Sequence, residues 1–335
     1  MRTLGPDRLP ALARGFALLG AGGGGATTLL ELMAAEVLDG PVALHDLDDL
    51  DPLTPCVAVG FAGSTYLLGE RVPAEDAFAP LLAAAERWTG VAAVAVCALE
   101  GAGLNGLTPF LLARGRTLVD ADLMGRALPG IDQLSLVVDA VPGVVLVADT
   151  GGGVMVVESA RAADVESLVR ASVIRAGGAG AVLVAGFTVG DLVAHGIRGT
   201  FARALALGES DVSAGELLGA RILGAGRVSA VDAVPDDAFA RSVELTGDDG
   251  ALLRLVARSE FLAVTRDGRT IAASPDVLVA IDTVSGDVLQ VDAVTLARHV
   301  RVLSLPAPEW WRESPERLAH VVPAAYGLRD LEMES

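Results

Sequence analysis

Apolar runs alternate with helical patterns through the first 160 residues, and this alternation restricts the fold more than any other feature. The runs "CVAVGF" (56–61) and "VAAVAVCAL" (91–99) are continuously apolar, as are strands of a parallel sheet that helices cover on both faces. The segments "TTLLELMAAEVL" (27–38) and "AEDAFAPLLAAAERW" (74–88) have helical spacing. The sequence therefore predicts an N-terminal three-layer α/β domain with a largely parallel sheet.

Three shorter runs are also predicted as strands of this domain: "GFALLG" (15–20), "RTLV" (116–119) and "LVVDAV" (136–141). Helices dominate from about 160 to 219, where Ser213 and Glu216 have the spacing of a capping box. Short strands and turns follow from 220, with hairpins expected at Asp267-Gly268 and Ser285-Gly286. We expect an α/β domain over 1–165 and a C-terminal domain over 166–335, which starts with helices and has a β-rich unit at about 220–305.

The charge balance excludes several functions. The formal net charge is −18, which makes nucleic acid a poor partner. All cations are arginine, so Schiff-base chemistry and a phosphate-binding P-loop lysine are excluded. No apolar run reaches the ~18 residues of a membrane span, and "MRTLGPDRLP" lacks a signal peptide's apolar segment. We expect a soluble cytoplasmic protein, with Cys56 and Cys97 as reduced core thiols.

The stretch "GAGGGG" offers two interpretations. Gly20, Gly22 and Gly25 match GxGxxG between a predicted strand and a helix, and Asp46 follows at the distance of a ribose-binding acid. Free N–H groups at a helix start bind anions, whereas a tight turn with close packing needs glycine for its shape alone. The crowded extra glycines argue against a dinucleotide, so we expect substrate or an anion there.

A second segment, "LEGAGLNGLTPFLLARGRTLVDADLMGRALPG", combines glycine with acids. Glu100 follows a predicted strand and Asn105 begins the next helix, while Asp120 and Asp122 follow the strand "RTLV". Two carboxylates at this spacing bind a metal, or one acts as a base while the other pairs with Arg126. The alternative is that Asp122 caps a helix and Arg126 neutralises the pair.

In order along the chain, "LGAGGGG", "EGAGLNGLTPFLLARGRTLVDADLMGRALP", "ARSEFLAVTRDGRTIAASPDVLVAIDTVSGDVL", "LPAPEWW" and "PAAYGL" resemble the bacterial S-methyl thiohydantoin desulfurase family over nearly the whole chain. This family was long catalogued beside hydantoinase/oxoprolinase-like genes. The resemblance implies a two-domain hydrolase-like protein. Its reaction would be water attack on an S-methylated five-membered thiohydantoin, with loss of methanethiol. Ser259, Leu128 and Tyr326 depart from the family pattern.

The resemblance and the strand ends together predict one pocket at the carboxyl edge of the sheet. Catalytic roles are predicted for Asp120, Asp122 and Glu100. Substrate binding is predicted for Gly22, Gly23, Gly24, Gly25, Asn105, Arg126 and Glu260. A divalent metal such as zinc would be held by Asp120, Asp122 and His195, although a histidine at a helix end is also a common cap.

Three functional classes stay open on the sequence. The first is a hydrolase acting on a hydantoin-like ring. The second is a ligand-binding or non-catalytic subunit beside a hydantoinase/oxoprolinase-like partner, and the third is a dinucleotide-dependent oxidoreductase. In the first two the ligand is a small molecule and no dinucleotide is expected. We also expect a homo-oligomer.

Overall fold

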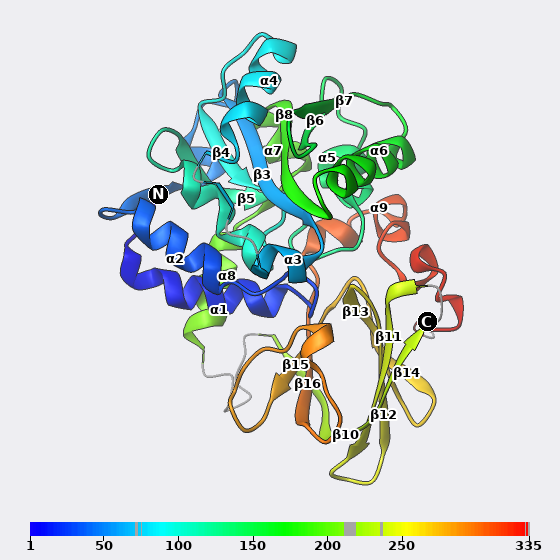
Figure 1. Ribbon diagram of the computed structural model, residues 1–335. Coiled ribbons are helices and arrows are strands. Elements are labelled where there is room, and N and C mark those ends of the chain that lie inside the picture. Colours follow the sequence, from blue (N-terminus) through cyan, green and yellow to red (C-terminus); the bar gives the residue numbers. More distant parts are fainter. Residues whose placement is uncertain (71–72, 75, 211–218, 235–236, 332, 334–335) are drawn as a thin grey trace.

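Two β-sheets organise the molecule, and the helices gather mainly on the first of them (Figure 1). The computed structural model describes residues 1–70, 73–74, 76–210, 219–234, 237–331 and 333. The helices are α1 Leu9–Leu19, α2 Thr28–Val37, α3 Thr65–Glu70, α4 Ala79–Thr89, α5 Ser135–Val138, α6 Ala162–Arg175, α7 Val189–His195, α8 Thr200–Glu209 and α9 Pro315–Ala319. The strands are β1 Arg2–Leu4, β2 Val42–His45, β3 Pro55–Gly63, β4 Ala95–Ala98, β5 Thr117–Asp122, β6 Val145–Asp149, β7 Val154–Val157, β8 Ala179–Thr188, β9 Ile197–Arg198, β10 Arg221–Val234, β11 Asp237–Gly247, β12 Leu252–Arg258, β13 Glu260–Arg266, β14 Arg269–Ala273, β15 Val277–Asp282 and β16 His299–Leu305.

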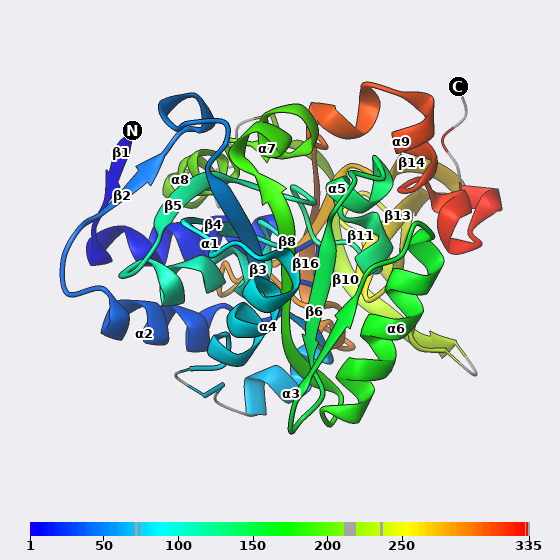
Figure 2. The same ribbon diagram turned by 90° about the horizontal axis from the view of Figure 1, so that it is seen from above.

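The first sheet has the strand order β1-β2-β5-β4-β3-β8-β6-β7, with β9 beside β5. Figure 2 shows its strands from β1 to β6. The block β2-β5-β4-β3 is parallel, and antiparallel strands extend it on both sides. Side chains alternate between the faces, so Val57 and Val59 pack with α1, α2, α4 and α8. Cys56 and Ala58 pack with α6, α7 and the tryptophans of the C-terminal segment. Helices therefore cover both faces, and the predicted α/β class is confirmed.

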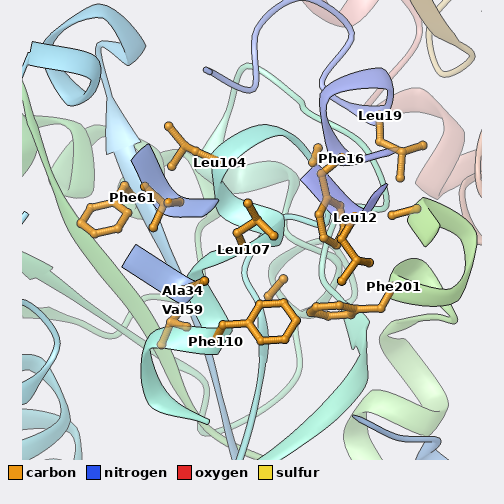
Figure 3. Close-up of a cluster of buried hydrophobic side chains, with 14 of the residues drawn as sticks. Leu12, Phe16, Leu19, Ala34, Val59, Phe61, Leu104, Leu107, Phe110 and Phe201 are labelled. Carbon is orange, nitrogen blue, oxygen red and sulfur yellow. The ribbon is translucent and has the colours of Figure 1, made fainter. Parts of the chain in front are cut away.

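The segment 15–20 is not a strand, because residues 15–19 form the second half of α1 and Gly20 is its C-cap. Leu9, Leu12, Ala13 and Phe16 repeat at the helical spacing and are all buried. Phe16 packs edge-on against Phe201 of α8 at a ring distance of 5.3 Å (Figure 3). The glycine stretch therefore joins two helices, α1 and α2. The run 136–141 was also predicted as a strand, but its first residues lie in α5.

The second sheet has the order β14-β13-β12-β11-β10-β16-β15 and is antiparallel throughout. The hairpin predicted at Asp267-Gly268 joins β13 to β14. The glycine stretch bonds directly to this sheet's domain: Phe261 N donates to Ala21 O at 2.7 Å, and Val291 N donates to Gly22 O at 2.8 Å. These bonds fix the second sheet beside the carboxyl edge of the first.

Cys56 and Cys97 are buried free thiols, as predicted. The capping box predicted at Ser213 and Glu216 lies outside the described residues. Within the described part of the chain, no helix has the length and apolar character needed to cross a membrane.

Candidate active site

A cavity of about 980 Å³ opens where the carboxyl ends of β3 and β4 meet the second sheet. Walls from both domains enclose it, so neither domain forms it alone. Its lining includes six of the residues predicted for the site: Gly22, Gly23, Gly24, Glu100, Asn105 and Glu260. The lining does not include the other predicted residues: Gly25, Asp120, Asp122, Arg126 and His195.

Glu100 enters the cavity from the loop after β4 and is buried. Burial is the main reason that its pKa lies well above the ordinary value, and the negative charges of Glu260 and Asp122 raise it further. Hydrogen bonding to the Leu128 backbone and the Asn105 side chain acts in the opposite direction. The surroundings of the Glu100 carboxyl group therefore favour its protonated form.

Glu260 comes from the other domain, as the first residue of β13, and is 4 % exposed. Burial raises its pKa to about 8, although the charge of Arg126 lowers it. Its Oε2 atom is buried and has no hydrogen-bond partner among the described residues. An unpartnered buried acceptor costs free energy, so this oxygen is available to a ligand.

Asn105 is fixed against the end of β3. Its Oδ1 accepts from Phe61 N at 2.7 Å, and its Nδ2 donates to Phe61 O at 2.9 Å. The amide thus replaces a strand partner at the point where β3 reaches the cavity. Asn105 is the sole asparagine of the sequence, and its backbone bonding makes it a positioning residue beside Glu100.

The glycine stretch contributes shape more than hydrogen-bond donors. The N–H groups of Gly23 and Gly24 both donate to Gly20 O, at 2.8 and 3.1 Å, and Gly25 N donates to Gln290 Oε1 at 3.0 Å. A Cβ on Gly23 would lie 2.6 Å from Cγ and Cδ of Glu260. The lack of a side chain at Gly23 therefore makes room for the Glu260 carboxylate.

Asp120 and Asp122 hold loops together behind the cavity. Asp120 accepts from Phe201 N at 2.8 Å and Ala202 N at 3.3 Å, at the start of α8. Asp122 accepts from Gly101 N, from Gly125 N at 2.7 Å and from Thr200 Oγ1 at 3.0 Å. Burial raises the pKa of Asp122 to about 6. Both aspartates therefore stabilise the backbone around β5 and the start of α8.

Arg126 is fully buried and joins the two domains. Its Nε donates to Ala127 O at 2.8 Å, and its Nη1 donates to Pro275 O at 2.9 Å and Asp276 O at 2.6 Å. Only Nη2 lacks a partner among the described residues. Bidentate binding of a substrate carboxylate needs two free donors, so this guanidinium does not offer it. It also makes no ion pair with Asp120 or Asp122 within the described structure.

His195 lies outside the cavity lining. Its Nδ1 lies 2.7 Å from Asp139 Oδ2, and Arg317 binds the same carboxylate at 2.6 Å. Among the described residues, no group of three or more His, Cys, Asp or Glu side chains is arranged to hold a metal ion. The structure therefore does not assemble Asp120, Asp122 and His195 into the predicted ligand set.

Tyr326 is a cavity residue to which the sequence analysis gave no site role. Its hydroxyl accepts from Gln133 Nε2 at 2.8 Å, and burial is the main reason that its pKa rises to about 12. The charges of Arg126 and Glu260 also act on this phenol. No local motif joins residues as far apart as 133 and 326, so the sequence carries no signal for this contact.

The comparisons with known proteins show the family and the fold. A family model described as S-Me-THD-like, N-terminal domain, matches residues 7–159, and its C-terminal counterpart matches 160–335. The chain belongs to the S-Me-THD-like family. This confirms the resemblance drawn from the sequence motifs.

A crystal structure of a protein from Chromobacterium violaceum has the same fold, with a TM-score of 0.80. The two chains are 21 % identical, and the match covers 100 % of this chain and 99 % of the other. At that identity the match shows the fold alone. A search of curated proteins gave no match.

Proposed function

We propose that this protein is a hydrolase that removes methanethiol from an S-methylated, five-membered thiohydantoin-type ring. The observation that carries the proposal is the carboxyl pair Glu100 and Glu260, which reach one cavity from different domains with raised pKa values. The charge of Glu260 raises the pKa of Glu100, so Glu100 keeps its proton when Glu260 ionises. Such a pair supplies both an acid and a base to one reaction.

The reaction needs one water molecule. The ionised carboxylate takes a proton from water, and the water oxygen forms a bond to the ring carbon that carries the methylthio group. The carbon–sulfur bond then breaks, and the protonated carboxyl gives its proton to the departing methanethiolate. The products are the ring with an oxygen in place of sulfur, and methanethiol.

The test is thiol release from an S-methyl thiohydantoin by the purified full chain, followed with a chromogenic disulfide reagent. Glu100→Gln and Glu260→Gln should each lower kcat at least ~100-fold, the usual scale of general acid–base loss. Glu86→Gln on the exposed surface of α4 is the matched control and should keep full activity. Binding of the ring without thiol release by the unaltered protein would instead favour the non-catalytic binding subunit.

The same assay tests the zinc expectation. Chelator treatment followed by zinc addition should change turnover if a metal takes part. Loss of turnover with the chelator and restoration by zinc would support a metal requirement, whereas unchanged turnover would count against it.

A further inference from the structure

The cavity is larger than its proposed reaction requires. Its volume of about 980 Å³ is at the upper end of the range of about 300–1,000 Å³ that holds drug-sized ligands. A five-membered ring with a methylthio group fills a small part of such a space. Glu100 and Glu260 mark the place of the ring, so the remaining volume is open to a substituent on it.

One part of the wall is apolar, and we call it the apolar arm. It consists of Phe61, Tyr66, Leu67, Val169, Val173 and Ile174. These side chains come from the end of β3, from α3 and from α6. The arm begins beside the site of the ring, because Asn105 binds both the N–H and the C=O of Phe61.

The elements of the arm meet closely. Ser64 N donates to Gly178 O at 2.8 Å, which joins the end of β3 to the chain after α6. A Cβ on Gly63 would lie 2.6 Å from Val173 Cγ1, and a Cβ on Gly178 would lie 2.7 Å from Leu67 Cδ1. Side chains of α3 and α6 therefore lie against the same junction, between the end of β3 and the chain after α6.

The charged residues of α6 on the same face already have partners. Glu166 Oε2 accepts from Ile131 N at 2.7 Å, and Arg170 Nε donates to Glu166 Oε1 at 2.5 Å. At the rim, Tyr66 is 66 % exposed and Ile174 is 68 % exposed. Large apolar side chains this exposed beside a cavity gain free energy when an apolar group covers them.

We infer that the substrate ring carries a bulky alkyl or aryl substituent, which binds in the apolar arm while the ring lies at Glu100 and Glu260. The inference rests on the proposed function for the place of the ring. It goes beyond that function, because the reaction itself does not require a bulky substituent on the ring.

Calorimetry with three hydantoins, the oxygen-containing products, tests it. The probes carry no substituent, a benzyl group or a carboxymethyl group. The benzyl compound should bind at least ~10-fold more tightly than the unsubstituted ring. Equal or tighter binding of the unsubstituted or the carboxymethyl ring would overturn the inference. Thiol release from the matching S-methyl compounds tests the proposed function separately, because binding preference does not depend on turnover.

Two rim variants test the location. Ile174→Ser and Tyr66→Ser should each reduce the benzyl preference by about fivefold, since each removes apolar contact area. Leu168 lies on α6 with Ile174, is 45 % exposed and is outside the cavity lining. The variant Leu168→Ser should therefore keep the full preference for the benzyl compound. A preference unchanged in both rim variants would contradict the placement in this arm. All three positions are exposed, so the melting temperature provides the check on folding.

Discussion

Glu260 is a carboxyl group that the fold makes costly to ionise. Burial raises its pKa from 4.5 to about 8. For an acid whose pKa is higher in the folded state, the stabilising contribution is complete below the unfolded pKa. It is lost as pH rises through the folded pKa. The affected window therefore runs from about pH 4.5 to above pH 8.

We expect the Glu260→Gln variant to gain stability relative to the unaltered protein as pH rises from 6 to 9. The amide cannot ionise, so the variant escapes a pH-dependent loss on the order of a few kcal/mol. Melting temperatures of the two proteins across this range measure the difference. A constant difference from pH 6 to pH 9 would show that this carboxyl does not titrate as described. The variant also loses the Glu260 charge that raises the pKa of Glu100, so the change at Glu100 acts in the same direction and adds to the gain.

Gly23 controls the position of the Glu260 carboxylate through the space it leaves. In Gly23→Ala the new Cβ would lie 2.6 Å from Cγ and Cδ of Glu260, so the side chain must move. We expect kcat for thiol release to fall at least ~10-fold, because small displacements of a reacting group are costly. Gly115→Ala is the control, since nothing lies within 4 Å of a Cβ there. Full activity in both variants would show that the position of the Glu260 carboxylate does not matter for the reaction.

At the scale of elements, Asp122 ties β5 to the loops after β4 and β5 and to α8. Asp122→Ala leaves the N–H groups of Gly101 and Gly125 without this acceptor, and each orphaned buried donor costs about 1–3 kcal/mol. We therefore expect a large fall in melting temperature. Asp122→Asn retains an acceptor oxygen, so it should be milder and keep turnover within about tenfold. A loss of at least ~100-fold in Asp122→Asn at unchanged melting temperature would instead assign this residue to catalysis.

The elements that the sequence predicts well are those with one unambiguous period. The continuous run 91–99 contains β4, although the strand covers only Ala95–Ala98, and the helical spacing of 74–88 contains most of α4, Ala79–Thr89. The run 15–20 was misread because six apolar residues fit either a buried strand or a buried helix. The wider window from Leu9 to Leu19 contains the helical repeat that decides it. Gly15 is tolerated in that helix because α8 crosses there: a Cβ would lie 2.8 Å from Ala204 Cα.

The sequence predicts a site residue correctly where the residue directly follows a strand that ends at the cavity. Glu100 follows a parallel strand, and ligands bind at the carboxyl ends of such strands. The same rule misplaced Asp120 and Asp122, because position along the chain does not show which backbone N–H groups a carboxylate will meet. The contact between Gln133 and Tyr326 joins segments 193 residues apart, and only the assembled fold brings them together.

The whole molecule carries a formal charge of −18, from 43 acidic residues and 25 arginines. This excess repels itself in the compact state. Surface ion pairs such as Arg198–Asp48 act in the opposite direction, but exposed pairs contribute only about 0–1 kcal/mol each. Unpaired negative charge therefore outweighs them in deciding how stability responds to salt.

We expect the melting temperature at pH 8 to rise when sodium chloride increases from 10 to 150 mM, because the screening length falls from about 30 to about 8 Å. Shorter screening weakens repulsion between distant carboxylates more than attraction within close pairs. At pH 5, where carboxylates begin to protonate, the same salt step should produce a smaller rise. A melting temperature that falls with salt at pH 8 would mean that ion pairs, rather than net repulsion, dominate the electrostatics of the fold.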